Sequence, residues 1–310
     1  MIGTVTLNPT VDKHYEVEKL IPGEAIRVRE NRQAAAGKGI QVAKVARLLG
    51  EEVIATGFLG GRNGEFIRET LEKSGIRTEF VPVATETRTC VNIRDLSTGR
   101  ITELLEEGAP VAESAKADFS RRFGGLLSRC GIIAICGSVP PGIDAQYVCG
   151  LIRTAKAAGK TVLFDASGGL LAEGIKASPD LIKPNRTELG ELIGRELSDH
   201  DDILAAARDL QKTGISNVIV SLGKDGAVFV LPEGTFRGTT PDIPVVNTVG
   251  CGDSMVAGFA AGLRQGLPAP EKIRLAMAVS TANALHKETG FFLQEDLEKL
   301  LSMVKAEQIN

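Results

Sequence analysis

This sequence is poor in histidine and tryptophan and has no excess of positive charge. It has no tryptophan and three histidines, and the histidines stand far apart, without the ligand spacing of a zinc site. The net charge is −3, so no broad basic surface is expected to attract nucleic acid or an anionic membrane. Neither is therefore an expected partner, and an anionic ligand would have to be held by local groups.

The sequence also lacks a long apolar run and a regular cysteine pattern. No stretch approaches the ~20 apolar residues of a membrane helix, and residues 1–9 have no basic start, so they are typical of a strand and not of a signal peptide. The cysteines are odd in number and form no CxxC pair, which favours reduced thiols and a cytoplasmic location. They are Cys90, Cys130, Cys136, Cys149 and Cys251.

What is present is an alternation of short apolar segments with longer amphipathic ones. Buried strands are predicted at 53–58, 132–136, 161–165, 181–183 and 218–222. Helices are predicted at 63–73, 145–158 and 201–213. The tail from Gly252 onward is expected to be mostly helical. This order predicts an α/β fold in three layers, with a mostly parallel sheet between helices.

Two regions depart from this alternation. Residues 12–34 and 85–106 contain polar, alternating, strand-like runs with no helix of their own. We expect them to pair into a small β-sheet that projects from the core and serves as a lid or a dimer contact. The alternative is a pair of unrelated surface hairpins.

The segment 247–254 is the strongest indication of function. It reads Asn-Thr-Val-Gly-Cys-Gly-Asp-Ser and precedes a helical run at 255–264. Gly250, Cys251 and Gly252 can form a tight turn whose free N–H groups, at a helix start, bind an anion. Asp253 would repel that anion unless it accepts a proton from an attacking hydroxyl. The alternative is that Asp253 is a favourable first-turn acid on an ordinary helix.

This segment resembles the GxGD signature of the ribokinase-like (PfkB-type) carbohydrate kinases, and the resemblance covers essentially the whole chain. It is closest to the branch with 1-phosphofructokinase and tagatose-6-phosphate kinase. The supporting motifs, in order, are TLNPTVD at 6–12, AGKGIQ at 36–41, GG at 60–61, GSVPPG at 137–142, KPNRTE at 183–188 and SLGKDG at 221–226. The resemblance implies a single ribokinase-like domain over residues 1–310, with ATP and Mg²⁺ as cofactors.

On the substrate side, Asp12 follows an Asn-Pro turn at the end of the first strand, where open α/β sheets bind ligands. It could accept hydrogen bonds from sugar hydroxyls, or merely stabilise the turn. Lys38, between Gly37 and Gly39 at a helix start, could grip a phosphate. The motif is not a Walker A loop, because no Ser or Thr follows Lys38.

The resemblance adds four candidates on this side. Arg88 and Arg27, with Lys38, are candidates for the phosphate already on the substrate, since arginine suits bidentate phosphate contacts. Ser138 resembles the family's substrate-side serine. Gln41 stands where the family usually has a sugar-binding asparagine, which leaves the sugar's identity open.

On the nucleotide side, Asn185 and Glu188 are three residues apart at a helix start and could organise water around Mg²⁺. A capping role for Asn185 is the alternative. Asp165 could support the same water shell. The resemblance also implies nucleotide contacts, from Lys183 to the phosphates and from Asn283 near the adenine. The turn of Ser221, Gly223 and Gly226 resembles the family's nucleotide loop.

We therefore expect a cytoplasmic, homodimeric kinase that binds ATP and a small sugar phosphate. Fructose 1-phosphate, converted to fructose 1,6-bisphosphate, is the favoured substrate, and tagatose 6-phosphate is the alternative. A dinucleotide-dependent oxidoreductase would need GxGxxG after the first strand, where Leu7, Asn8 and Pro9 stand instead. A non-catalytic sugar-binding regulator is a more distant alternative.

Overall fold

A computed structural model describes residues 1–309, and an eleven-stranded sheet runs through its core. The strand order is β15-β14-β13-β12-β11-β10-β9-β1-β4-β5, with β6 also paired to β4. The parallel strands are β1 (Ile2–Thr6), β4 (Val53–Leu59), β5 (Arg77–Thr78), β6 (Val81–Pro82), β9 (Ile132–Cys136), β10 (Thr161–Asp165), β11 (Leu181–Ile182) and β12 (Asn217–Ser221). Three antiparallel strands follow at one edge: β13 (Ala227–Leu231), β14 (Gly234–Thr239) and β15 (Lys305–Ile309).

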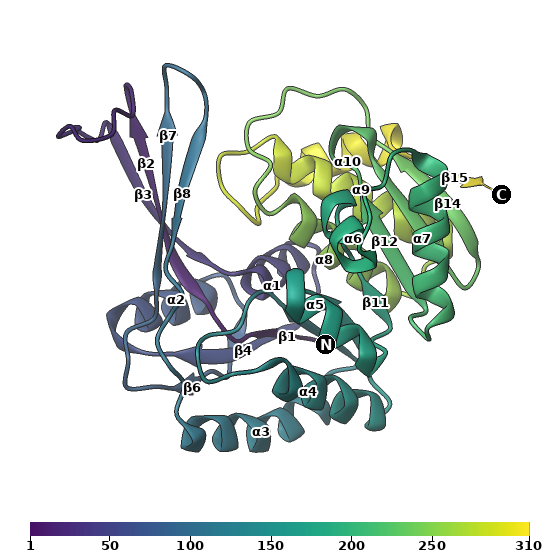
Figure 1. Cartoon of the computed structure of the whole chain (residues 1–310), viewed down its shortest axis with the longest axis horizontal. Helices are drawn as coiled ribbons and strands as arrows, with labels where there is room; N and C mark the ends of the chain where they lie inside the picture. The colour runs from purple at the N-terminus through teal and green to yellow at the C-terminus, as the bar shows by residue number, and fades with distance from the viewer. Residues whose placement is uncertain (310) are drawn as a thin grey trace.

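Helices cover both faces of this sheet, so the predicted three-layer arrangement is confirmed (Figure 1). One face packs on α1 (Lys38–Leu48), α2 (Gly61–Lys73), α8 (Cys251–Arg264), α9 (Ala269–Ala284) and α10 (Gln294–Met303). The other packs on α3 (Glu113–Leu127), α4 (Ala145–Ala157), α5 (Gly168–Gly174), α6 (Arg186–Ile193) and α7 (His200–Lys212). Short 3₁₀ turns lie at Ile175–Ala177 and Gly223–Asp225.

The strand β9 shows why this layering follows from the sequence. Its side chains alternate: Ile133 and Ile135 belong to one buried cluster, and Ile132 and Ala134 belong to the other. Because successive side chains of a strand point to opposite faces, a wholly apolar strand must be covered on both sides.

A second, four-stranded sheet stands away from the core, in the order β3-β2-β7-β8 (Figure 1). Its strands are β2 (Thr10–Val17), β3 (Glu30–Ala36), β7 (Thr89–Asp95) and β8 (Ile101–Leu105). The pairing of β2 with β7 is parallel and joins the two regions that interrupt the alternation. The predicted pairing is therefore confirmed, and the alternative of unrelated hairpins is wrong. We call these four strands the small sheet.

The sequence analysis missed the antiparallel edge of the main sheet. The tail is helical through Met303, as expected, but then forms β15. That strand is polar and has exposed residues, because it lies at the sheet edge, so it lacks the apolar signal of a buried strand. No helix among residues 1–309 is long and apolar enough to cross a membrane.

Candidate active site

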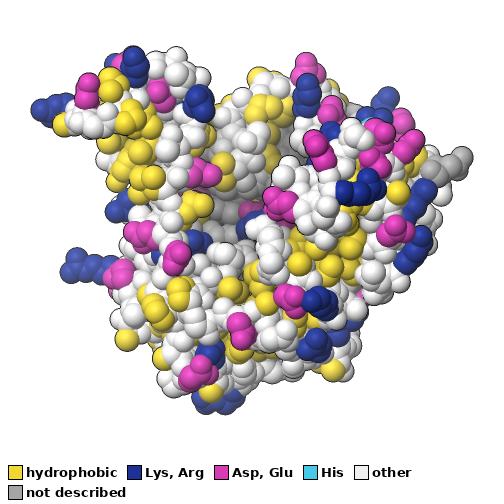
Figure 2. Space-filling view, viewed as in Figure 1, with side chains coloured by type: hydrophobic (Ala, Val, Ile, Leu, Met, Phe, Trp, Pro, Cys, Tyr) yellow, Lys and Arg dark blue, Asp and Glu magenta, His cyan; other side chains and the backbone are white. Residues whose placement is uncertain are grey.

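Functional side chains gather where the parallel strands of the main sheet end. Asp165 is the last residue of β10, Lys183 directly follows β11, and Ser221 is the last residue of β12. The helices α1 and α8 also begin in this region. The space-filling view shows a hollow between the small sheet and the body of the protein (Figure 2). Ligands of open α/β sheets bind at this edge.

The turn before α8 has the form expected of an anion site. Gly250 has φ +80°, a left-handed conformation that favours glycine, and α8 starts immediately at Cys251. The helix thus begins four residues earlier than the predicted run at 255, and Asp253 lies in its first turn. A β-carbon on Gly250 would lie 2.4 Å from Thr289 Cγ2. The N–H groups of this turn are free of helical partners and can bind an anion.

Asp253 lies within a cluster of two carboxylates and two lysines. Lys38 Nζ is 3.3 Å from both carboxylate oxygens of Asp165, and Lys183 Nζ is 3.7 Å from one of them. Asp165 is 1% exposed and Asp253 is 8% exposed. Two lysines therefore balance two buried carboxylates, which is the condition for burying such charges at tolerable cost.

The pKa values in this cluster suit proton transfer. Burial raises the pKa of Asp253 to about 7; Lys38 and Lys183 oppose this rise, and Asp165 adds to it. Burial also works against the charge of Lys38, but Asp165, Asp253 and Glu188 outweigh it and raise the pKa of that ammonium. Asp253 can therefore exchange a proton near neutral pH while Lys38 stays charged.

Asn185 and Glu188 form a capping box at the start of α6. Asn185 Oδ1 accepts a hydrogen bond of 2.9 Å from Glu188 N, and Glu188 Oε2 accepts one of 2.8 Å from Asn185 N. The capping alternative for Asn185 is thus confirmed. The bond occupies one of the two Glu188 carboxylate oxygens, and the charge of Glu188 still acts on Lys38. No group of three His, Cys, Asp or Glu side chains among residues 1–309 could enclose a metal directly.

The expected nucleotide loop lies next to this helix. Ser221 forms an isolated bridge with Asn185, and the turn from Gly223 to Gly226 follows as a short 3₁₀ segment. Lys183 is buried, and its Nζ would lie 2.9 Å from a β-carbon on Gly252. The ammonium of Lys183 therefore lies against the first turn of α8, next to Asp253.

The side chain of Asn283 makes its hydrogen bonds within the protein. It is 0% exposed; its Nδ2 donates to Val249 O at 3.0 Å and lies 3.5 Å from Cys251 Sγ, and its Oδ1 accepts from Gly290 N at 2.8 Å. Both ends of the amide are used inside the protein. Asn283 holds the anion turn in place, and its expected position near the adenine stays a prediction.

The expected sugar side holds polar atoms that have no protein partner. Asp12 Oδ1, Gln41 Oε1 and Arg88 Nε are buried without a hydrogen bond within the described residues. Burial raises the pKa of Asp12 to about 6, with Glu103 adding to it and Thr10, Arg88 and Lys44 opposing it. Unsatisfied buried polar atoms are costly, and a hydroxyl-rich ligand would supply the missing hydrogen bonds.

Arg88 and Ser138 lie together on this side. Arg88 donates to Glu106 O at 2.7 Å and to Asn8 O at 3.0 Å, and Asn8 Nδ2 donates to Ser138 Oγ at 3.2 Å. Arg88 lines a small cavity with Asn8 and Pro140. Two backbone carbonyls thus fix the guanidinium in place before any ligand binds.

Two expected members of this cation group lie elsewhere. Arg27 is exposed in the connection between β2 and β3, at the outer end of the small sheet (Figure 1). Lys38 follows the N-cap residue Gly37, and Gly39 packs its helix start against β1. From there Lys38 pairs with Asp165 on the catalytic side. Of the three expected phosphate cations, Arg88 directs its charged group toward Ser138, whereas Lys38 directs its ammonium to Asp165.

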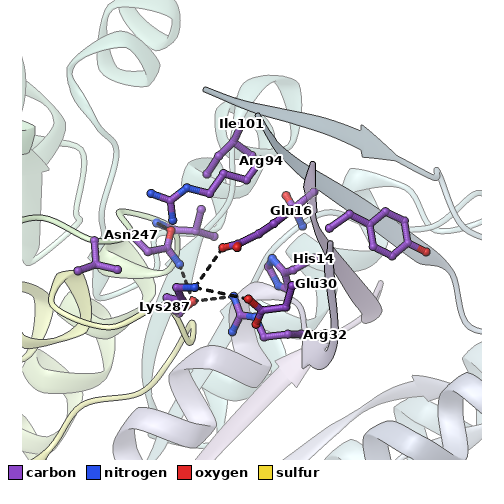
Figure 3. A pocket seen from close by; sticks show the side chains of 12 residues that line it. His14, Glu16, Glu30, Arg32, Arg94, Ile101, Asn247 and Lys287 are labelled. Atoms are coloured by element: carbon purple, nitrogen blue, oxygen red, sulfur yellow. Dashed lines mark hydrogen bonds and ion pairs between the residues drawn. The ribbon is translucent and has the colours of Figure 1, made fainter. Parts of the chain in front are cut away.

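The sequence analysis missed the contact between the small sheet and the residues after α9. Lys287 Nζ lies 3.1 Å from Glu16 Oε1 and 3.6 Å from Glu30 Oε2, and Arg32 donates to Lys287 O at 3.3 Å (Figure 3). Asn247 Nδ2 also donates to Lys287 O, at 3.2 Å. These residues join the small sheet to the segment just before the anion turn.

A second missed residue is Lys44, on α1. Its Nζ donates to Thr289 O at 2.7 Å and lies 3.6 Å from Glu288 Oε1. Lys44 is three residues after Gln41, a spacing that places both on one helix face. The spacing from Gln41 is the sequence signal by which Lys44 could have been found.

Comparisons with known proteins agree with the motifs. The model of the pfkB family of carbohydrate kinases matches residues 2–296. The chain is similar to tagatose-6-phosphate kinase of Staphylococcus epidermidis, with 33% identity over 312 residues and all of both chains covered.

Solved structures are similar over nearly the whole chain. A Thermotoga maritima protein named a possible 1-phosphofructokinase has 27% identity and a TM-score of 0.89, with 100% of both chains covered. Arabidopsis thaliana ribokinase, solved with ribose and ATP, has 23% identity and a TM-score of 0.80, with 97% of this chain and 98% of that chain covered. The latter likeness shows the ribokinase-like fold, which confirms the expected fold class.

Proposed function

The chain belongs to the pfkB family of carbohydrate kinases, and from this premise we propose that it transfers the γ-phosphoryl group of ATP to a ketohexose monophosphate. The observation that carries the proposal is Asp253: a buried carboxylate, whose pKa burial raises to about 7, in the first turn of the helix that follows Gly250. Use of ATP is what the family implies.

In the proposed step, Asp253 accepts the proton of the attacking sugar hydroxyl. The hydroxyl oxygen forms a bond to the γ-phosphorus as the bond from that phosphorus to the β–γ bridging oxygen breaks, and ADP leaves with the electron pair. The N–H groups at the start of α8 stabilise the negative charge on the transferred phosphoryl group. Lys38 and Lys183, both within ion-pair distance of Asp165, keep positive charge beside the reacting groups.

The residues present fit Mg²⁺ held through water. Glu188, Asn185 and Asp165 offer oxygens near Lys38 and the anion turn, but not a set of three carboxylates close enough to enclose the ion. When bound with the nucleotide, Mg²⁺ neutralises phosphate charge and usually keeps several waters. Glu188 is the side chain that we expect to orient those waters.

We propose that the substrate arrives already phosphorylated, because Arg88 sits on the sugar side with its Nε buried and unpartnered. A phosphate monoester brings about −1.5 to −2 charge and several acceptor oxygens. In fructose 1-phosphate that phosphate lies at the opposite end of the carbon chain from the hydroxyl that reacts. We propose fructose 1-phosphate as the substrate and fructose 1,6-bisphosphate as the product.

Tagatose 6-phosphate is the second candidate. The full-length likeness to a protein named tagatose-6-phosphate kinase favours it, and it too carries its phosphate far from a free primary hydroxyl. We expect buried Gln41, whose Oε1 has no protein partner within the described residues, to contact a sugar hydroxyl.

We also propose that the chain forms a homodimer through the small sheet and works in the cytoplasm. Strand β8 exposes apolar side chains, with Ile101 at 47%, Leu104 at 56% and Leu105 at 66% exposure. Exposed apolar side chains gathered on one outer strand are typical of an interaction surface. The free thiols of all five cysteines support a reducing compartment. Light scattering of the parent and of Leu104→Glu tests the dimer.

The test of function is a coupled ADP-release assay over a panel of acceptors: fructose 1-phosphate, tagatose 6-phosphate, fructose 6-phosphate, free fructose and ribose. We expect fructose 1-phosphate to have the highest kcat/KM and free sugars to be far poorer. If the protein binds ATP but releases no ADP with any acceptor of the panel, the result would instead favour a non-catalytic regulator.

A further inference from the structure

Residues 287–290 connect three parts of the protein that the proposed reaction uses. Lys287 contacts the small sheet through Glu16 and Glu30. Thr289 O accepts the hydrogen bond from Lys44 of α1. Gly290 N donates to Asn283 Oδ1, and Asn283 in turn donates to Val249 O. We call residues 287–290 the connecting segment.

The connecting segment packs tightly against the anion turn. A β-carbon on Gly250 would lie 2.4 Å from Thr289 Cγ2 and 3.4 Å from Gly290 N. On its other side, a β-carbon on Gly290 would lie 2.2 Å from Gln41 Oε1, and Gly290 itself has φ +67°. A shift of Thr289 or Gly290 would therefore move the turn that precedes Asp253 and alter the surroundings of Gln41.

Lys44 is the residue of α1 that fixes this segment by a charged hydrogen bond. Its side chain is 12% exposed. Burial lowers the pKa of Lys44, while Glu288 and Asp12 oppose the decrease and favour the ammonium. A buried ammonium 2.7 Å from a backbone carbonyl makes a short, strong bond. Its charge also reaches Asp12, whose Oδ1 has no protein partner within the described residues.

We propose that Lys44 is a positioning residue that couples the sugar pocket to the anion turn: it holds Thr289 and Gly290 between Gln41, on the sugar side, and Gly250. The kinetic part of this proposal rests on the proposed function. The structural part does not, since it concerns contacts within the protein itself.

The charged groups that face Asp12 influence the pH at which it loses its proton. Arg88 and Lys44 favour the carboxylate, and Glu103 disfavours it. Removal of Lys44 takes away one of the two cations. The pH at which Asp12 loses its proton should therefore rise above its present value of about 6.

The test compares Lys44→Met with Lys44→Arg. Methionine fills a similar volume without the charge, and arginine restores a cation that can donate to Thr289 O. Lys272→Met is the matched control, because Lys272 is also a buried lysine (8% side-chain exposure) paired at 2.9 Å with a glutamate, Glu233, and it lies at the opposite end of α9 from Asn283. The Lys272→Met variant shows how much activity is lost when any buried lysine–glutamate pair is removed.

For Lys44→Met we expect kcat/KM for the sugar phosphate to fall about tenfold or more, the scale of a charged hydrogen bond, with KM for ATP within about twofold of the parent. The midpoint of sugar-phosphate binding against pH, measured by calorimetry without ATP, should move to higher pH. Lys44→Arg should recover most of the loss in kcat/KM and most of the shift in the pH midpoint. Lys272→Met should change neither quantity. Equal defects in the Met and Arg variants, or none in the Met variant, would overturn the kinetic part.

Hydrogen exchange without any substrate separates this inference from the proposed function. In Lys44→Met, amides of 287–291 and 248–253 should exchange faster than in the parent, while those of α4 should not. Unchanged exchange in these two stretches would overturn the coupling. If no acceptor of the panel is phosphorylated by the parent, the proposed function fails, and the exchange result still decides whether Lys44 holds the segment.

Discussion

Replacing Arg88 by alanine tests the view that the substrate carries a phosphate. Arg88 is held by the carbonyls of Asn8 and Glu106, which leaves its buried Nε without a protein partner. The variant should keep the fold and lose the guanidinium beside Ser138. Arg129→Ala is a suitable control, because Arg129 pairs with Glu79 on the surface and lines no expected pocket.

The size of the effect follows from what Arg88 contacts. Loss of a charged hydrogen bond to the phosphate should cost about 1.5–3 kcal/mol of transition-state binding, which lowers kcat/KM about 10- to 150-fold. The two lost bonds to carbonyls should lower the free energy of unfolding by about 1–2 kcal/mol. Arg88 also lowers the pKa of Asp12, so sugar binding in the variant should weaken further as the pH falls toward 6.

The assay is kcat/KM for each sugar with and without its phosphate, in the parent, in Arg88→Ala and in Arg129→Ala. We expect the preference for the phosphorylated form to collapse in Arg88→Ala only, with KM for ATP nearly unchanged. If the preference survives, or if the parent uses free sugars as well as their phosphates, the argument from Arg88 is wrong. The chain would then be better described as a kinase of neutral sugars.

Two further predictions concern the catalytic side. Glu188→Gln should raise the Mg²⁺ concentration needed for half-maximal turnover, because a charged oxygen near the nucleotide is lost while the capping bond to Asn185 N can persist; a Mg²⁺ titration that superimposes on the parent's would remove Glu188 from the metal site. Because the pKa of Asp253 is raised to about 7, its reactive carboxylate form declines at lower pH, so kcat/KM should fall about tenfold per pH unit well below that value. In Lys38→Met the midpoint should move higher, since Lys38 opposes the rise; an unchanged midpoint would contradict the pairing of these charges.

The sequence predicted the buried architecture well because that part depends on local chemistry. Apolar β-branched runs such as 132–136 can only be strands covered on both faces, and they appear at those residues. The turn at Gly250 and the helix start at Lys38 could be predicted because glycines in the sequence mark positions that need an unusual backbone conformation or a close approach.

The rest depends on contacts between residues far apart in the chain, which no local pattern specifies. Asn283 was expected near a ligand, but its amide is used by Val249 and Gly290. Arg27 was a candidate, with Arg88, for the substrate's phosphate, but within one chain it lies in the β2–β3 connection at the end of the small sheet. Lys44 belongs to none of the recognised motifs, and its hydrogen bond to Thr289 O spans 245 positions of the chain.

Turnover of Asp253→Asn tests the central claim most directly. Asparagine fills nearly the same volume in the first turn of α8 but cannot accept the proton of the attacking hydroxyl. With fructose 1-phosphate and with tagatose 6-phosphate, we predict that kcat falls at least ~10²-fold, the scale of a lost general base, while ATP affinity by calorimetry stays close to that of the parent. Near-normal kcat in this variant would contradict the assignment of Asp253 as the catalytic base.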